Sequence, residues 1–177
     1  MNESMQKAIT APIENFHLPA YEAIPDVGLY LEQTSKYISD YLAPLGESEL
    51  TGSMISNYVK KGLIKSPVKK QYDREQIAQL IFIAVAKTVI SIDDLHLMLG
   101  IQRRTYKSQK AYDYFCAELI NSLHYVFGLK KSLDTVGEDS TDQKLMLRNV
   151  IITVAHKVYL NKLCAELQKE EARLIKP

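Results

Sequence analysis

The sequence predicts a mainly α-helical fold in which a small β wing interrupts an N-terminal group of helices and a C-terminal helical unit follows. Three observations predict it. Apolar residues recur at intervals of three and four along most of the 177 residues, capping residues precede these stripes, and one short segment broken by proline separates two of them. We expect an arm over residues 1–25, a first domain over 26–100 and a helical unit over 101–177.

The first part of the chain predicts an arm and two helices. Residues 1–25 carry three prolines and no sustained apolar period, which predicts an extended arm or a loop that leads into the first helix. From Val27 to Leu42 an apolar stripe predicts an amphipathic helix, which Pro44 ends. Thr51, a good N-cap, begins a shorter predicted helix, and Gly62 suits the left-handed position after its end. Two helices joined by a turn result.

The next segment, from Leu63 to Tyr72, predicts the wing. It is too short and too broken by Pro67 for a helix, and its ends, Leu63-Ile64 and Gln71-Tyr72, are predicted to pair as strands. With the two preceding helices, this pairing would complete a winged helix-turn-helix domain with a small β wing.

Two further helices are predicted from their caps. Asp73 caps a helix so apolar that we expect it at the centre of the domain. Ser91 caps a short helix, with Asp94 three residues later, and Gly100 is predicted to close it.

Beyond Gly100 we expect two longer helices, over about residues 105–127 and 141–172. The last helix is apolar on more than one face, so one partner helix would leave apolar surface exposed. Two interpretations stay open: a homodimer formed through this unit, or a helix surrounded by the monomer's own elements. Four side chains are candidates for lining a pocket for a small-molecule effector, with core packing as the alternative: Met146, Tyr159, Phe115 and Phe127.

The charge of the chain is informative only by segment. The total is +1, but residues 1–59 hold eight acids against two lysines, and residues 60–74 hold six basic residues against Asp73 alone. A local excess of this kind attracts a polyanion, and the candidate phosphate-binding residues are Lys60, Lys61, Lys65, Lys69, Lys70 and Arg74. A second basic group either reaches a flanking phosphate or keeps its helix soluble: Arg103, Arg104, Lys107 and Lys110.

The helix after Thr51 carries the candidate base-contacting residues Ser53, Ser56 and Asn57. Short polar side chains can approach base edges in the major groove, and an asparagine amide can form a bidentate pair with adenine. The alternative is an ordinary solvated helix face.

The segments SNYVKKGLI, KKQYDREQIAQLIFI and ISIDDLHLML, in this order, resemble the DNA-binding domain of MerR-type transcription regulators. The resemblance implies an N-cap at Thr51, a packing tyrosine at Tyr58 and a phosphate contact from Lys70 in the wing. Ser56 and Asn57 stand where that family has an arginine and the first of two tyrosines. Over roughly residues 10–160 the arrangement more closely resembles an uncharacterised family from Gram-positive bacteria, a domain of unknown function whose members are described as transcriptional regulators.

Other function classes find no support in the motifs. Glycine-rich phosphate loops and nucleophile elbows are missing, so we predict no enzyme and no cofactor. The four histidines are scattered and the two cysteines, Cys116 and Cys164, lie in apolar surroundings, so we predict no metal site and two buried thiols. Without a long apolar run or a signal sequence, we expect a cytoplasmic location and no membrane association.

The function predicted from these patterns is a sequence-specific regulator of transcription, a repressor that binds double-stranded DNA as a homodimer. A protein-interaction module on a winged-helix scaffold without DNA binding is the alternative, in which the last helix docks on a partner.

Overall fold

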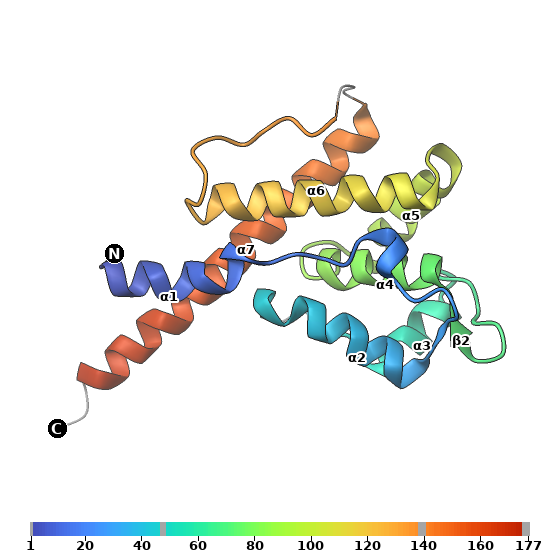
Figure 1. Ribbon diagram of the computed structural model, residues 1–177, viewed down its shortest axis with the longest axis horizontal. Coiled ribbons are helices and arrows are strands. Elements are labelled where there is room, and N and C mark those ends of the chain that lie inside the picture. Colours follow the sequence, from blue (N-terminus) through green and yellow to red (C-terminus); the bar gives the residue numbers. More distant parts are fainter. Residues whose placement is uncertain (1, 47–48, 138–140, 175–177) are drawn as a thin grey trace.

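The computed structural model describes residues 2–46, 49–137 and 141–174. Within these residues the chain is mainly helical with one two-stranded antiparallel sheet, which confirms that part of the predicted fold (Figure 1). In chain order the elements are α1 (Glu3–Glu14), the 3₁₀ turn η1 (Tyr21–Ala23), β1 (Leu29–Tyr30), α2 (Leu31–Leu42), the 3₁₀ turn η2 (Ala43–Leu45), α3 (Gly52–Lys60), β2 (Gln71–Tyr72), α4 (Arg74–Ala86), α5 (Ile92–Thr105), α6 (Ser108–Val126) and α7 (Asp142–Leu174).

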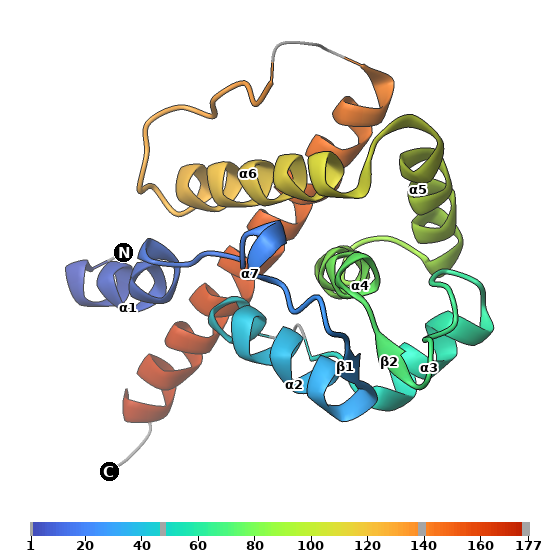
Figure 2. The same cartoon turned by 45° about the vertical axis from the view of Figure 1, so that its right-hand side comes forward.

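The central element is α4, as its apolar sequence predicts. Nine of its 13 residues are buried, and Figure 2 shows it nearly end-on with α2, α5 and α6 around it. Asp73 and Gln76 form a capping box at its start, in which each side chain accepts a hydrogen bond from the backbone N–H of the other residue. The core therefore forms around a helix whose start is fixed by its own sequence.

The N-terminal arm is extended only in part. Residues 3–14 form α1, which packs along α7, so the prediction of an extended arm is wrong there. Pro12 inside the helix costs about 3 kcal/mol, but Met5, Ile9 and Ile13 are buried at spacings of four, and each contributes about 1.5–3 kcal/mol. The tertiary contact outweighs the proline. Residues 15–28 contain no helix except η1.

The small sheet differs in its partner from the predicted wing. Gln71–Tyr72 pairs with Leu29–Tyr30, antiparallel, and not with Leu63-Ile64. Leu63 and Ile64 are 0% and 2% exposed, since their apolar side chains enter the core instead. The pairing also explains why α2 begins at Leu31 rather than at Val27, because the preceding two residues form β1.

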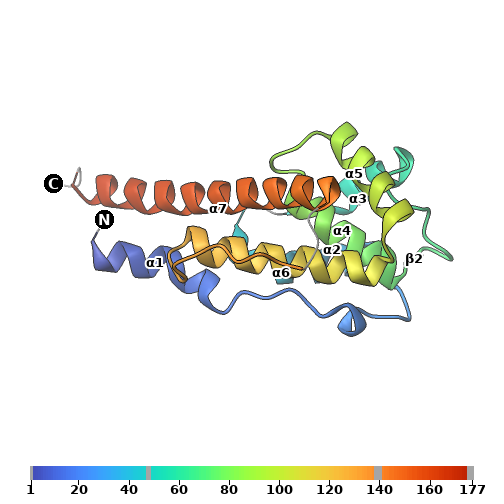
Figure 3. The same ribbon diagram turned by 90° about the horizontal axis from the view of Figure 1, so that it is seen from above.

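Two further predictions need correction in the C-terminal half. Gly100 does not end α5, which continues to Thr105, because Gly100 lacks the positive φ of a helix-terminating glycine. Of the two cysteines predicted as buried, Cys116 is partly buried but Cys164 is exposed. Cys164 lies in the C-terminal half of α7, which extends with α1 away from the other helices (Figure 3).

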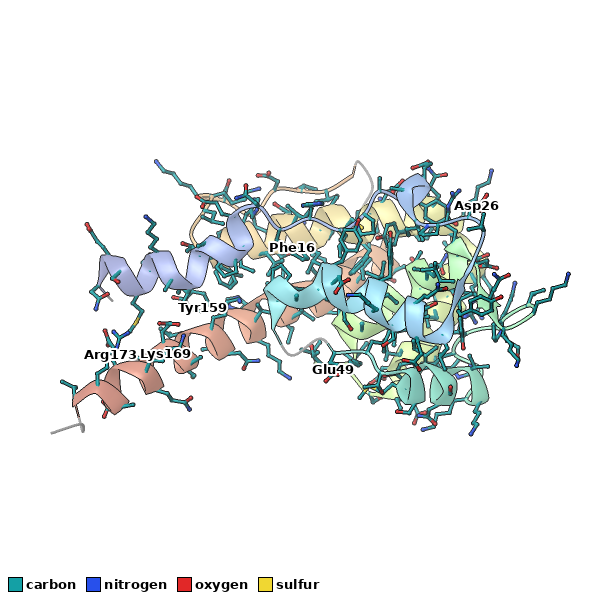
Figure 4. All side chains as sticks on the ribbon, turned by 60° about the horizontal axis from the view of Figure 1, so that its bottom comes forward. Phe16, Asp26, Glu49, Tyr159, Lys169 and Arg173 are labelled. Atoms are coloured by element: carbon teal, nitrogen blue, oxygen red, sulfur yellow. The ribbon has the colours of Figure 1, made fainter. Side chains whose placement is uncertain are left out.

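The pair formed by α1 and α7 defines the far end of the molecule. The Nδ2 atom of Asn2 donates to Oε1 of Glu170 at 3.0 Å, and Figure 4 labels Lys169 and Arg173 on the end of α7 that lies beside the first turn of α1. Within the described residues no helix combines the length and the apolar character needed to cross a membrane.

Candidate nucleic-acid interface

The helix α3 has the ends that its sequence predicts. The Oγ1 atom of Thr51 accepts a hydrogen bond from the backbone N–H of Met54 at 3.3 Å. At the other end Gly62 has a φ of 71°, its N–H donates to Val59 and the N–H of Leu63 donates to Tyr58. These two bonds form a Schellman motif, so the predicted N-cap and the predicted glycine terminus are both confirmed.

One face of α3 is packed and the opposite face is open. Ile55 and Tyr58 are 0% and 5% exposed, and burial raises the pKa of the Tyr58 hydroxyl. The side chains of Ser53, Asn57 and Lys60 are exposed, and their spacing of three and four places them on one side of the helix. Of the three predicted base-contacting residues, Ser53 and Asn57 therefore lie together, whereas Ser56 is partly buried.

A two-residue hairpin follows α3, and we call residues 68–71 the lysine turn. Its ends exchange two backbone hydrogen bonds, from Val68 to Gln71 at 3.1 Å and from Gln71 to Val68 at 2.9 Å. The residues between them, Lys69 and Lys70, have φ angles of 49° and 66°. Positive φ at both central positions is the requirement of a type I′ turn, which glycine and asparagine normally fill. Two lysines held in this way are strained residues with exposed side chains.

The lysine turn is attached firmly at its base. Tyr72, directly after it, is 4% exposed. On the other side, the Nε2 atom of Gln76 in α4 donates to the carbonyl of Lys65 at 2.8 Å. The burial of Tyr72 on one side and the bond from Gln76 on the other thus hold the turn, which projects from the edge of the molecule beside β2 (Figure 1).

Arg74 is not available to phosphate in the way that its charge predicts. Its Nε donates to the carbonyl of Ile24 at 2.9 Å and its Nη2 to that of Glu22 at 3.2 Å. Its guanidinium also lies 3.8 Å from the carboxylate of Asp26, which Figure 4 labels, and 5.9 Å from the ring centre of Tyr21. The arginine therefore holds residues 22–26 against the start of α4. The five predicted lysines, in contrast, are all exposed.

The second basic group likewise contains one arginine that makes structural hydrogen bonds and other side chains that do not. Arg103 donates through Nη2 to the carbonyl of Leu63 and, at 3.2 Å, to Oε1 of Gln79, so it links α5 to the end of α3 and to α4. Arg104 and Lys107 are exposed. Lys110 lines a cavity between α4, α5, α6 and α7.

Sequence reasoning missed a lysine that positions α3. The Nζ atom of Lys87, just after α4, donates to the carbonyl of Glu49 at 2.5 Å and lies 3.4 Å from the sulfur of Met54. Burial lowers its pKa, and the nearby carboxylate of Glu49 acts in the opposite direction. The contact holds the segment before α3 against the core helix, and only the tertiary fold brings these residues together.

The predicted pocket residues separate into two places. Phe115 and Met146 line the cavity between α4 and α7, which has a volume of about 380 Å³. Phe127 and Tyr159 pack against each other instead, edge to face with ring centres 5.2 Å apart. Among the described residues no group of three histidine, cysteine, aspartate or glutamate side chains could hold a metal ion.

One protein family matches the part of the chain that contains these features. Residues 19–115, more than half of the chain, match the model of a domain of unknown function, DUF1836, and the chain belongs to this family. The match begins before η1 and ends within α6, so it includes α2, α3, the lysine turn, α4 and α5. No curated protein and no solved structure matches.

Proposed function

We propose that this protein is a sequence-specific DNA-binding regulator, in which α2 and α3 form a helix-turn-helix and the lysine turn forms the tip of a wing. The observation that carries the proposal is the strained lysine turn beside a helix with an open polar face. Strain of this kind persists where the surrounding structure over-determines it, and such residues cluster at functional sites. Here the strained turn places the side chains of Lys69 and Lys70 at a projecting tip.

The open face of α3 supplies the second half of the argument. An α-helix fits the major groove of B-form DNA, and its short polar side chains reach base edges there. Asn57 is the side chain suited to a bidentate contact with adenine, and Ser53 lies one turn before it on the same exposed side. Lys60 and Lys61, at the end of the helix, are placed to contact phosphates and fix the orientation of α3.

The charge distribution supports the same surface. Between Lys60 and Tyr72 the chain contains five lysines and no acidic residue, and all five lysines are exposed. DNA association depends on such local charge, because each neutralised phosphate releases condensed counterions.

We also propose that the protein acts as a homodimer joined through α7. Leu160, Leu167 and Leu174 are 55%, 45% and 81% exposed and recur every seven residues, which is the repeat of a coiled-coil seam. A second copy would cover this stripe and place two α3 helices on DNA with twofold symmetry. Replacement of Leu160 and Leu167 by glutamate should convert a dimer to a monomer in light scattering, and a monomeric parent protein would contradict this part.

The proposal is tested by selection from a pool of random duplex DNA, followed by anisotropy titration of the enriched duplex. We expect one enriched sequence with approximate twofold symmetry, and repression of a reporter whose promoter contains it. Parent protein that enriches no sequence and leaves the anisotropy of any duplex unchanged at about 50 mM salt would overturn the proposal. Capture of a protein partner through α7 under those conditions would favour the interaction module instead.

A further inference from the structure

The small sheet has one buried face and one open face. In an antiparallel pair, the side chains of directly opposed residues lie on the same side of the sheet. Leu29 opposes Tyr72 on the buried side, where Tyr72 belongs to the core. Gln71 opposes Tyr30 on one edge and Val68 on the other. The open face therefore carries three neighbouring side chains, which we call the outer row: Tyr30, Gln71 and Val68.

The outer row is apolar at both ends and polar at its centre. Tyr30 and Val68 are both more than half exposed. Gln71 is partly exposed, and its carboxamide makes no hydrogen bond to any residue that the structure describes. Gly28, with a φ of 79°, leaves the space beside it, because a Cβ added at Gly28 would lie 3.0 Å from the Cβ of Gln71. The row thus offers amide donors between two apolar flanks.

The outer row adjoins the surface proposed for DNA. Val68 and Gln71 are the two ends of the lysine turn, so the row begins where the two lysines project. The sheet and α3 lie at the same end of the molecule (Figures 1 and 2). Major and minor grooves alternate along B-form DNA, so an element beside a helix in the major groove meets an adjacent minor groove.

The dimensions of the outer row suit that groove. Opposed residues in a sheet have Cβ atoms about 4.5–5.5 Å apart, so the flanks formed by Tyr30 and Val68 stand about 10 Å apart. The minor groove is about 6 Å wide and about 7.5 Å deep. In this groove the long side chain of Gln71 would reach the base edges, and the two flanks would pack on the sugars of opposite strands. The lysines of the turn would lie over the bordering phosphates.

We propose that the outer row enters the minor groove next to the site of α3 and selects base pairs without the 2-amino group of guanine. This role rests on the function proposed above, in which α3 contacts DNA. Every base pair presents acceptors in the minor groove, which suit the amide donors of Gln71, and guanine adds a donor, its 2-amino group. Val68 offers that donor no partner, and a donor buried without a partner weakens binding. Runs of A·T pairs also have a narrow minor groove whose negative potential attracts lysine.

Inosine distinguishes recognition in the minor groove from recognition in the major groove. An I·C pair lacks the 2-amino group but presents the major-groove edge of a G·C pair. The experiment is an anisotropy titration of the whole chain with three forms of the enriched duplex at one salt concentration. The forms differ only in the pairs flanking the sequence at which the variant N57A loses its preference, and these pairs are all A·T, all G·C or all I·C. We expect the A·T and I·C forms to bind alike and the G·C form to bind roughly tenfold more weakly.

Two variants test the outer row itself. In V68T the side chain keeps its branched shape, and its hydroxyl can accept a hydrogen bond from the 2-amino group, so the three forms should bind within about twofold of one another. The matched control is V27T, which makes the same change at an exposed valine outside the paired residues and should discriminate as the parent does. Q71A should bind the A·T form about two- to tenfold more weakly than the parent. It should melt at the parent's temperature, because the backbone bonds of the turn remain.

The possible failures point to different conclusions. Equal binding of all three forms by the parent would overturn the entry of the outer row into the minor groove and leave the proposed function intact. An I·C form that binds as weakly as the G·C form would also overturn it, because the flank would then be recognised in the major groove. A V68T variant that discriminates as the parent does would remove Val68 from the contact and refute the role of the row. Failure of every duplex to bind would refute the proposed function, and the role of the outer row with it.

Discussion

The lysine turn allows stability and DNA binding to be changed in opposite directions. Each non-glycine residue in the left-handed region costs about 1–2 kcal/mol, and asparagine and glycine are the residues that a type I′ turn prefers. The double variant K69N/K70G should therefore stabilise the fold by about 1–2 kcal/mol, after allowance for the greater chain entropy of glycine. In a chain of this size the melting temperature should rise by roughly 2 to 8 °C.

The same double variant should bind DNA more weakly. Each phosphate contact contributes about −0.9 to the slope of log K against log salt, so the loss of two contacts reduces the slope by about 1.8. At about 0.15 M salt this corresponds to a roughly 30-fold weaker affinity. A more stable protein that binds less well cannot be explained by partial unfolding.

The assays are thermal unfolding and anisotropy titration of one duplex at four salt concentrations. The control is the double variant K7Q/K131Q, because it removes the same charge from exposed positions on α1 and after α6. The control should keep the parent's slope. If K69N/K70G shows the parent's slope and affinity, the lysine turn does not contact phosphate. If it melts lower than the parent, the turn is not strained in the way that its φ angles indicate.

Three further predictions concern residues whose roles the structure separates. R74Q should lower the free energy of unfolding by about 1–3 kcal/mol in urea titration, because charged hydrogen bonds to two carbonyl groups are lost, but it should leave the salt dependence of DNA binding unchanged. K65Q should leave the free energy of unfolding unchanged and reduce the slope of log K against log salt by about 0.9. N57A should reduce the preference for the selected sequence by about 1–3 kcal/mol without weakening nonspecific binding, as competition titrations would measure. Native protein at pH 8 should expose one reactive thiol, Cys164, to a disulfide reagent, and denatured protein two. Burial raises the pKa of the Cys116 thiol to about 12, which leaves a thiolate fraction of about 10⁻⁴.

The elements that sequence predicts well are those whose ends are set by neighbouring residues. Thr51, Asp73 and Ser91 each accept a hydrogen bond from the backbone three residues later, as their N-cap positions predict. Gly62 similarly ends α3 through bonds within its own turn. In each case the signal and the structure that it specifies lie within a few residues of each other.

The elements that were missed depend on distant partners. The helix α1 exists because its buried face meets α7, where Asn2 bonds to Glu170, 168 residues later, and β2 pairs with residues before α2 rather than with the start of its own segment. The lysine turn carries no asparagine or glycine, so its type I′ geometry has no local signature. Tertiary contacts override the proline count in the first case and the nearest candidate strand in the second.

In the candidate site, a count of charges from the sequence does not predict which basic side chains are available to a ligand. A count over residues 60–74 treats six basic residues as equivalent, but Arg74 is hydrogen-bonded to backbone carbonyl groups and the five lysines are solvated. Arg103 is bound in the same way in the second group. A guanidinium has several donors in a planar array and suits such structural contacts, whereas a lysine on a flexible stem stays in water. In this protein, therefore, Arg74 and Arg103 make structural contacts, whereas the five lysines stay exposed.

The proposed interface combines a fixed backbone with mobile charges. Gln76 and Tyr72 anchor the two sides of the lysine turn through a neutral amide bond and apolar burial, neither of which salt weakens. The lysine side chains themselves make no contact that restricts them in the described structure. Such an arrangement places the charges without the entropic cost of ordering the loop on binding, and leaves each ammonium free to follow phosphates of differing position. Because both anchors belong to α4 or adjoin its first turn, a shift of α4 relative to α5 would move the whole charged tip as one unit.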